Sequence, residues 1–210
     1  MDNITLYMWA TPNSRRISIL FEELGLNFDV QPVNIRAKEQ FAPEIVALNP
    51  FGKVPIVAWQ ENGEQRLLFE SGAIIQYFAE QKGQFFPLDR TKRSETLSWL
   101  MVALTGLGPH SASAHYWSDL AVEKSIQALN YHVSFTARVY SLLDERLAQG
   151  EYLAGDYSIA DIAAYPWINV SEWTTLNIED YKNLARWYKK ISLRPAVKRG
   201  MSLPTGVTLE

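Results

Sequence analysis

The chain has 210 residues, of which 47% are hydrophobic and 20% are charged, and its formal net charge is −3. This composition is typical of a folded globular protein and excludes a disordered one. Because basic and acidic residues are interspersed, it also argues against a nucleic-acid or anionic-membrane surface as the main partner. No apolar run approaches the roughly 20 residues of a membrane span, and residues 1–5 lack the features of a secretion signal, so we expect a cytoplasmic protein.

The sequence contains no cysteine. A disulfide framework, a thiolate zinc site and a cysteine nucleophile are therefore excluded. The three histidines, His110, His115 and His132, do not have the spacing of a metal site, and we expect no bound metal. Any thiol chemistry must use a sulfur that a small molecule supplies.

The N-terminal part of the chain alternates strand and helix patterns. Residues 4–9 are β-branched and aromatic and are followed by a turn at residues 11–13, which predicts a strand. Apolar residues then recur at helical spacing over residues 14–25, and residues 28–33 predict a second strand. These segments are typical of a right-handed βαβ unit with a parallel pair. The polar residues 40–43 predict a loop.

A second group of elements is expected after this loop. Residues 54–59 predict a strand with Pro55 near its start, a turn follows at residues 62–64, and residues 67–69 predict another strand. Residues 70–72 then open a helix. Its apolar side would carry Ile74, Ile75, Phe78 and Ala79.

The pattern changes in the second part of the chain, where strand signals end and long amphipathic stretches run to about residue 200. We therefore expect an α/β domain at residues 1–84 and an all-helical domain at residues 91–205, with a linker at residues 83–92. Ser158, followed three residues later by Asp161, predicts a capping box at the start of a helix.

Three elements of the sequence together resemble the cytosolic glutathione transferase family. They are Val54-Pro55 at the start of the third strand, residues 70–72 at the start of a helix, and the capping box. The resemblance runs from Leu6 to about Pro195. It implies a thioredoxin-like N-terminal domain followed by an all-helical C-terminal domain.

Three further runs are similar to the bacterial Nu class of this family. They are residues 11–13, residues 40–44 and residues 106–109. Members of the Nu class reduce disulfides with glutathione and are related to the yeast prion-forming nitrogen regulator. The resemblance therefore implies a glutathione-dependent enzyme.

The resemblance also implies a partner in the chain for each charged group of glutathione. Ser71 and the free amides behind it would bind the γ-glutamyl carboxylate, and Glu70 would face the ammonium. The alternative is that Ser71 is only a helix N-cap and Glu70 only a favourable first-turn acid. Lys53 and Gln40 would meet the glycyl carboxylate, unless both are ordinary solvated side chains.

The backbone around Pro55 has a predicted role of its own. The resemblance implies a cis peptide bond before Pro55. Val54 would then present its N–H and C=O to the cysteinyl backbone of glutathione and pair with it like one more strand. The alternative is an ordinary trans proline at the start of a strand.

Ionisation of the glutathione thiol is the centre of the expected mechanism. A free thiol has a pKa of about 8.5, which must be lowered for the thiolate to dominate at neutral pH. One hydrogen bond and the positive end of a helix are sufficient, and the resemblance assigns Thr11 and Asn13 to the sulfur. Asn13 alternatively serves only as the helix cap. Tyr7, on the first strand, fits the core better than catalysis, and Ala10 has no hydroxyl to offer.

The second substrate is expected to meet an aromatic wall. Trp9, His115, Tyr116 and Trp117 are the candidates, and the alternative for all of them is core packing. Nu-type relatives often carry an arginine that serves a second glutathione across a dimer interface. Tyr131 occupies the matching position here, which weakens a mechanism with two bound glutathiones.

The first functional hypothesis is a glutathione transferase that acts through the thiol of bound glutathione as a disulfide-bond reductase, with peroxidase activity as a further reaction. Two alternatives remain. One is conjugation of glutathione to a small electrophile, or cleavage of an ether or halide bond in such an electrophile. The other is a non-catalytic glutathione-binding or regulatory module. Glutathione is expected as a co-substrate with no tightly bound cofactor, and the resemblance implies a homodimer.

Overall fold

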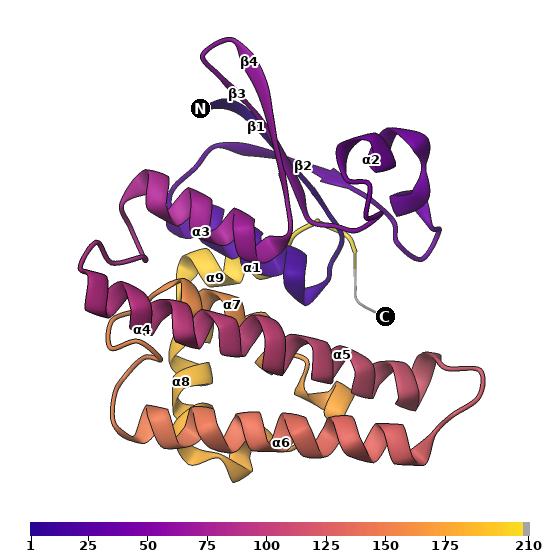
Figure 1. Cartoon of the computed structure of the whole chain (residues 1–210), viewed down its shortest axis with the longest axis vertical. Helices are drawn as coiled ribbons and strands as arrows, with labels where there is room; N and C mark the ends of the chain where they lie inside the picture. The colour runs from indigo at the N-terminus through magenta and orange to yellow at the C-terminus, as the bar shows by residue number, and fades with distance from the viewer. Residues whose placement is uncertain (208–210) are drawn as a thin grey trace. The chain divides into compact units, whose positions relative to one another are not determined.

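A computed structural model of the chain describes residues 1–207. The chain forms two compact units (Figure 1). The first unit comprises Met1–Lys82 together with the chain from Arg194 onward, and the second comprises Gly83–Leu193. The first unit contains the β-sheet and its covering helices, and the second is helical. The expected fold class, a thioredoxin-like α/β domain and an all-helical domain, is confirmed.

The sheet of the first unit has four strands. They are β1 (Asp2–Met8), β2 (Phe28–Pro32), β3 (Ile56–Glu61) and β4 (Glu64–Phe69), in the spatial order β2-β1-β3-β4. β1 and β2 pair in parallel, as the predicted βαβ unit requires, and the other two pairs are antiparallel. The predicted turn between the last two strands is confirmed, with Asn62 and Gly63 at positive φ between β3 and β4.

Helices α1 (Pro12–Glu23) and α3 (Ser71–Lys82) pack together in this unit. Side chains alternate along β1, so that Leu6 and Met8 are fully buried while Tyr7 points to the other face. Aromatic rings join the sheet to the helices, because Trp59 of β3 and Phe21 of α1 both contact Phe78 of α3, with ring centroids 5.4 and 4.7 Å apart. Edge-to-face and tilted pairs of this kind add about 0.5–1.5 kcal/mol each beyond the burial of their area.

The other face of the sheet is partly covered by a segment that the sequence did not predict as helical. The prediction of a loop at residues 40–43 is wrong. A 3-10 turn, η1 (Glu39–Phe41), and a short helix, α2 (Pro43–Leu48), occupy this region. Pro43 opens α2 and Glu44 follows in its first turn, both of which favour a helix start. Ile45 of α2 then packs in a small cluster with Val33 and Ile56.

Helix α9 (Pro195–Met201) belongs to the first unit, and Figure 1 shows it beside α1. The backbone carbonyl of Gly200 accepts a hydrogen bond of 2.7 Å from Ser18 Oγ. A side chain at Gly200 would lie 2.6 Å from the backbone of Ile19, so only glycine permits this close approach. The compact units therefore differ at the C-terminal end from the predicted domain bounds, 1–84 and 91–205, because α9 packs on α1.

The second unit consists of helices joined by short connections. Its first helical stretch begins at Arg90, inside the linker predicted at residues 83–92, with Asp89 as its N-cap. A π-helical turn ends just before Gly108 and Pro109, where proline cannot donate the regular helical hydrogen bond. The elements are α4 (Arg90–Met101), η2 (Val102–Leu107), α5 (Gly108–His115), η3 (Tyr116–Leu120), α6 (Ile126–Ala148), α7 (Ile159–Ile168), η4 (Ser171–Thr174), η5 (Ile178–Asp180) and α8 (Lys182–Ser192).

The predicted capping box at the start of α7 is confirmed. Asp161 is fully buried, and both of its carboxylate oxygens accept hydrogen bonds. Oδ1 accepts from the backbone N–H of Leu153 at 3.0 Å and from Trp187 Nε1 at 2.8 Å. Oδ2 accepts from the backbone N–H of Ser158 at 3.0 Å and from its hydroxyl at 3.1 Å. Burial nevertheless raises the pKa of Asp161 to about 6, against the opposing effect of these four donors.

Within residues 1–207, no helix is long and apolar enough to span a bilayer. The same part of the chain contains no group of three or more His, Asp and Glu side chains arranged to hold a metal ion.

Candidate glutathione site

Three chain segments meet at one end of the sheet of the first unit. The register pairs Tyr7 of β1 with Ile56 of β3, and Ile56 with Phe69 of β4. Because β3 is antiparallel to both neighbours, the end of β1, the start of β3 and the end of β4 lie side by side at this end of the sheet. We call this end of the sheet the site edge. The segments that follow β1, precede β3 and follow β4 contain most of the residues predicted to bind glutathione.

Thr11 follows β1 and caps helix α1. Its backbone is extended, with φ −91° and ψ 153°, as expected for a residue before proline. Its hydroxyl accepts from the backbone N–H of Ser14 at 3.4 Å and donates to Ser14 Oγ at 3.1 Å. Asn13 lies inside the first turn of α1 and is half-buried. The alternative in which Asn13 serves only as the helix cap is therefore wrong, because Thr11 is the cap.

Val54 and Pro55 come immediately before β3. The peptide bond between them is cis, so the alternative of a trans proline is wrong. Both ladders of β3 have their terminal pair at Ile56, which leaves Val54 outside the paired region. The side chain of Val54 packs against the cluster of Val33, Ile45 and Ile56, and this packing holds its backbone at the edge of the sheet.

Glu70 and Ser71 lie where β4 passes into helix α3. Glu70 is exposed and has a left-handed backbone with φ 68°, and its carbonyl accepts the first helical hydrogen bond, from Ile74 N–H at 2.9 Å. A non-glycine residue in this conformation costs about 1–2 kcal/mol. Ser71 is therefore the first helical residue and not the N-cap, which corrects the alternative considered from the sequence. Its side chain is buried, with 6% of the residue exposed.

The side chain of Arg16 of α1 contacts Ser71, and the sequence did not predict this contact. Arg16 is 1% exposed, and its Nη1 donates to Ser71 Oγ at 3.2 Å. Its Nε and Nη2 are buried and have no hydrogen-bond partner in the described part of the chain. Burial lowers the pKa of Arg16 to about 9, and the charge of Glu70 opposes this decrease. The guanidinium is therefore still charged at neutral pH.

Gln40 and Lys53 come from two neighbouring loops. Asn49 Nδ2 donates to the carbonyl of Lys53 at 2.8 Å and so fixes the turn before β3. Gly52 in this turn has φ 62° and faces the carbonyl of Gln40 and the ring of Phe41. The Lys53 ammonium is exposed and lies 4.3 Å from the centroid of Phe51, whereas Gln40 Oε1 is buried without a hydrogen-bond partner among the described residues.

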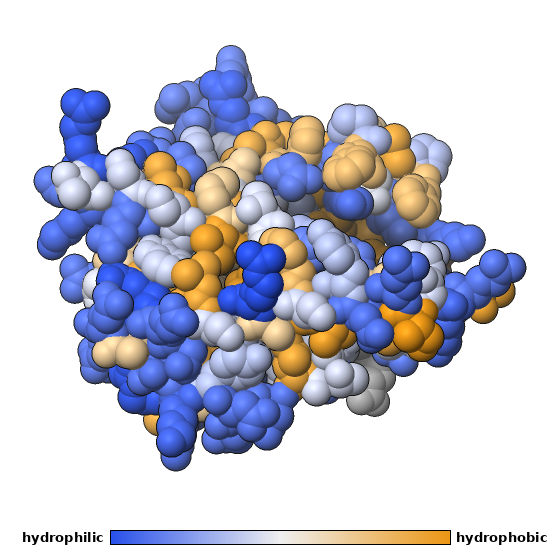
Figure 2. Space-filling view, turned by 60° about the horizontal axis from the view of Figure 1, so that its bottom comes forward, coloured by the Kyte–Doolittle hydropathy of each residue, from blue (hydrophilic) through white to orange (hydrophobic). Residues whose placement is uncertain are grey.

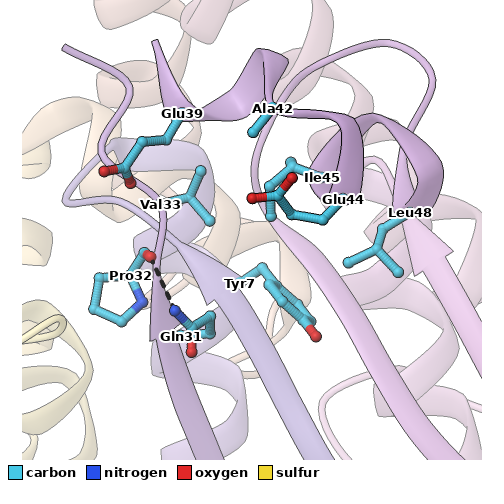
Figure 3. A pocket seen from close by; sticks show the side chains of 9 residues that line it. All are labelled: Tyr7, Gln31, Pro32, Val33, Glu39, Ala42, Glu44, Ile45 and Leu48. Carbon is cyan, nitrogen blue, oxygen red and sulfur yellow. Dashed lines mark hydrogen bonds between the residues drawn. The ribbon is translucent and has the colours of Figure 1, made fainter. Parts of the chain in front are cut away.

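A hollow of about 550 Å³ lies on the sheet face that carries Tyr7 (Figure 3). Its lining combines apolar side chains with Gln31 and the carboxylates of Glu39 and Glu44. Tyr7 is half-buried and packs against the Ile45 cluster at this hollow. The lining residues are Tyr7, Gln31, Pro32, Val33, Glu39, Ala42, Glu44, Ile45 and Leu48, and the predicted glutathione residues of the described chain are not among them.

The residues predicted to meet a second substrate are divided between the two units. Trp9 follows β1 in the first unit and is half-buried. In the second unit, Tyr116 and Trp117 contact each other edge to face with ring centroids 5.1 Å apart. His115 stacks on Trp173 at 4.3 Å, and its Nδ1 lies 3.0 Å from an Asp119 carboxylate oxygen. These contacts give His115 a packing role in addition to any role toward substrate.

Tyr131 lies on α6 beside a pair of histidines. It is 61% exposed, and its ring centroid is 5.9 Å from that of His110. His110 and His132 approach with their Nδ1 atoms 3.0 Å apart, so one must donate and the other accept. His110 also stacks on Phe135 at 3.7 Å. Burial, together with the charge of His132, lowers the pKa of His110.

The fold and the edge site define a protein with a thioredoxin-like domain followed by a helical domain. Residues 10–81 match the family model for the glutathione S-transferase N-terminal domain, and residues 99–195 match that for the glutathione S-transferase C-terminal domain. The chain belongs to the glutathione S-transferase family.

Comparison with individual relatives agrees with the Nu-class resemblance. The chain is 34% identical over 202 residues to the disulfide-bond oxidoreductase YfcG of Escherichia coli, covering 94% of each chain. A glutathione transferase structure from Burkholderia graminis, with two glutathione molecules bound per subunit, matches with a TM-score of 0.90 and 33% identity over 98% of this chain and 90% of that one. Another from Pseudomonas putida, with one glutathione disulfide bound per subunit, matches with a TM-score of 0.89 and 31% identity over 97% and 92%.

Proposed function

We propose that this enzyme of the glutathione S-transferase family is a glutathione-dependent disulfide-bond reductase. The observation that carries the proposal is the meeting of the N-termini of α1 and α3 with the Val54 backbone at one end of the sheet. The names of the relatives support it as well, because YfcG and YghU of Escherichia coli, both 34% identical, are called disulfide-bond oxidoreductases.

Glutathione binds across this edge in the proposal. Its γ-glutamyl carboxylate meets Ser71 and the free amides of the first turn of α3, where the helix dipole favours an anion. Its ammonium meets the exposed carboxylate of Glu70, and its cysteinyl backbone pairs with Val54. Lys53 and Gln40 bind the glycyl carboxylate. Two observations support this role: the Lys53 ammonium is exposed, and Gln40 Oε1 is buried without a hydrogen-bond partner within residues 1–207.

The cysteinyl sulfur then lies at the start of α1, near Thr11 and Asn13. Lowering a thiol pKa by about two units requires roughly 2.7 kcal/mol of preference for the anion. A hydrogen bond to a charged group supplies about 1.5–3 kcal/mol. The positive end of α1 adds up to about 1 kcal/mol. One donor and the helix terminus are therefore enough to make the thiolate dominant at neutral pH.

The reaction consists of two thiol–disulfide exchanges. The glutathione thiolate attacks one sulfur of the substrate disulfide, forms a mixed disulfide and releases the other sulfur as a thiolate. A second glutathione thiolate attacks the glutathione sulfur of the mixed disulfide, which gives oxidised glutathione and releases the second substrate thiol. Because the chain has no cysteine, both electrons and both attacking sulfurs come from glutathione.

Two substrates of different chemistry separate this proposal from its alternatives. Bis(hydroxyethyl) disulfide reports disulfide reduction, and chlorodinitrobenzene reports conjugation. A specificity constant at least about tenfold higher for the disulfide agrees with the proposal, and the reverse order favours the conjugating enzyme. Binding of glutathione without turnover of either compound favours the non-catalytic module.

The role of Thr11 is tested by Thr11→Ala, with Thr11→Ser as the matched control. In the proposal the Thr11 hydroxyl, which donates to Ser14 Oγ at 3.1 Å in this structure, turns its hydrogen to the sulfur when glutathione is bound. Thr11→Ala is therefore expected to raise the pKa of the bound glutathione thiol and to lower kcat/KM about 10- to 100-fold, since it removes this hydrogen bond to the anion. Thr11→Ser keeps the hydroxyl and should retain most of the activity. The thiolate absorbance of bound glutathione, titrated against pH, measures the pKa directly. Asn13→Ala is expected to act in the same direction, and unchanged kinetics in both alanine variants would leave the sulfur site without support.

We further propose that the enzyme is a homodimer. Large apolar side chains are exposed in both units, including Phe41 and Phe51 in the first and Met101 and Leu142 in the second. Figure 2 shows apolar side chains, in orange, among polar ones on one face of the molecule. Exposed apolar side chains mark a protein-binding surface where they form a contiguous patch, and these residues are the candidates for such a patch. Light scattering after size exclusion should give twice the chain mass of 24.0 kDa.

A further inference from the structure

The buried guanidinium of Arg16 is only partly satisfied by the protein. It makes one hydrogen bond, of 3.2 Å, to Ser71 Oγ, while Nε and Nη2 have no partner within residues 1–207. Buried polar groups are nearly always paired, and an unpaired one costs free energy in the folded protein. Arg16 is also 1% exposed, so it cannot reach a ligand in the solvent directly. Arg16 can therefore act on a ligand only through Ser71 or through the electric field of its own guanidinium charge.

The hydrogen bond between Arg16 and Ser71 has a defined polarity. A guanidinium has donors only, so Ser71 Oγ must accept from Arg16. The hydroxyl hydrogen of Ser71 is then available to donate in another direction. Ser71 opens α3, where the backbone N–H groups of the first turn also lack helical acceptors. The hydroxyl and these amides together form a set of donors above a buried positive charge.

Glu70 supplies the opposite charge next to this donor set. Its carboxylate is exposed, and its left-handed backbone with φ 68° directly precedes the donor set at the start of α3. The charge of Glu70 acts on Arg16, since it opposes the lowering of the Arg16 pKa that burial causes. A cation buried below Ser71 and an anion exposed beside it match a zwitterionic α-amino acid group, which carries a carboxylate and an ammonium on one carbon.

We propose that Arg16 is a positioning residue for the α-carboxylate of the γ-glutamyl group, acting through the orientation of Ser71 and through its buried charge. The inference rests on the proposed function, because it takes glutathione as the ligand of this edge. Arg16 holds Ser71 Oγ as an acceptor, so the Ser71 hydroxyl donates to the carboxylate, and the buried charge favours the anion above it. The site would therefore select thiols that carry a free γ-glutamyl α-carboxylate.

The experiment compares glutathione with γ-aminobutyryl-cysteinyl-glycine, which lacks only the α-carboxylate. Calorimetry measures the affinity of both tripeptides for the wild type and for Arg16→Met, which is similar in length and has no charge or donor. Arg16→Met is expected to weaken glutathione binding by at least about tenfold, the lower end for a hydrogen bond to a charged group. Binding of the analogue should stay within about twofold, since it has no carboxylate to lose. An equal loss for both ligands would overturn the proposal, because it would indicate a general structural role.

A double-mutant cycle tests whether Arg16 acts through Ser71. Ser71→Ala should weaken glutathione binding, and adding Arg16→Met should then cost no more than about threefold, although Arg16→Met alone costs about tenfold. Fully additive losses would contradict the route through Ser71. In turnover assays, the KM for glutathione should rise while kcat at saturating glutathione changes by less than about threefold, since ground-state and transition-state binding lose the same contact.

Arg16→Lys is the conservative control, because it retains the charge and one donor. It should bind glutathione more tightly than Arg16→Met, and equal affinities would count against a role of the charge. If Arg16→Met does not fold, as judged by circular dichroism, Arg16→Gln takes its place with the same two decisive outcomes. A wild type that does not bind glutathione refutes the proposed function. A wild type that binds it, with Arg16→Met unchanged, overturns only the role of Arg16.

Discussion

Among residues 1–207, each of the two units buries one side chain that is charged in water, and the two side chains differ in how far the protein satisfies their hydrogen bonds. Asp161 in the second unit has four donors on its two oxygens, all supplied by the protein. Arg16 in the first unit makes one hydrogen bond, and two of its nitrogens lack a partner within the described residues. Burial favours the neutral form of each group, so it raises the pKa of Asp161 and lowers the pKa of Arg16.

The difference shows how a buried polar group that stabilises the fold can be separated from one that serves a ligand. A fully satisfied carboxylate at a helix start, such as Asp161, belongs to a capping box, and its loss should affect folding. A partly satisfied cation below a helix start, such as Arg16, contributes little to folding, and its loss should affect binding. Four predictions follow from the largest expected effect to the smallest, and the first three test this separation.

Asp161→Ala should lower the free energy of unfolding by at least about 4 kcal/mol, because four buried donors lose their acceptor and each unsatisfied donor costs at least about 1 kcal/mol. Urea denaturation followed by circular dichroism measures the change. Any protein that remains folded should keep the wild-type KM for glutathione, since Asp161 lies in the helical unit and is not part of the edge site. A loss of less than about 1 kcal/mol would show that the network is not stabilising.

The stability contributed by Asp161 should depend on pH. Its pKa is raised from 3.8 to about 6 in the folded protein, so its contribution is fully present below about pH 3.8 and is lost as the pH rises through about 6. The change of this pKa from 3.8 to about 6 corresponds to roughly 3 kcal/mol. Asp161→Asn cannot titrate and serves as the reference. The stability difference between wild type and Asp161→Asn should shrink by about this amount between roughly pH 4 and pH 7, and a growing difference would contradict the raised pKa.

Arg16→Met should leave the free energy of unfolding within about 1 kcal/mol of the wild type, or raise it, because a buried charge with unpaired donors is replaced by an apolar chain of similar length. Thermal and urea unfolding at neutral pH measure this. The same variant is expected to bind glutathione less tightly, so stability and affinity would move independently. Destabilisation as large as that of Asp161→Ala would remove the distinction between the two sites.

The pair formed by His110 and His132 should produce the smallest effect. The pKa of His110 is lowered in the folded protein, so its contribution to stability is present above its ordinary pKa of 6.5 and is lost as the pH falls below that value. Because both rings are partly exposed, the loss should stay below about 1 kcal/mol. His132→Gln removes the second charge and should lessen the loss between roughly pH 6.5 and pH 5. Equal pH profiles for both proteins would contradict the coupling.

Much of the fold could be predicted because its signals are local. The strand–helix–strand pattern of residues 4–33 and the capping box are readable within short windows, and both are confirmed. Helix α2 was missed because six residues are too few to show helical periodicity. The association of α9 with α1 was missed for a different reason. Ser18 and Gly200 are 182 positions apart, and no local pattern in either segment indicates that the two are in contact.

The candidate site shows the same limit. Thr11 and Glu70 were found from short runs next to predicted strands and helices, and the register of the sheet brings those runs to one edge. Arg16 was missed because one arginine of an Arg-Arg pair in a helix is usually solvated. A signal was nevertheless present, since the following five residues, 17–21, are apolar or small and indicate a helix buried on several sides. Only the contact with Ser71, 55 positions away, gives Arg16 a role.

The return of α9 to the first unit has a consequence for synthesis of the chain on the ribosome. The helix that presents Thr11 is among the first segments to emerge, yet the surface that covers Ile19 comes from Gly200 and its neighbours. The whole intervening helical unit must be translated before this surface exists. Nascent chains halted before about residue 194 should therefore leave the Ile19 side of α1 uncovered, and α1 should reach its final packing only when α9 has left the exit tunnel.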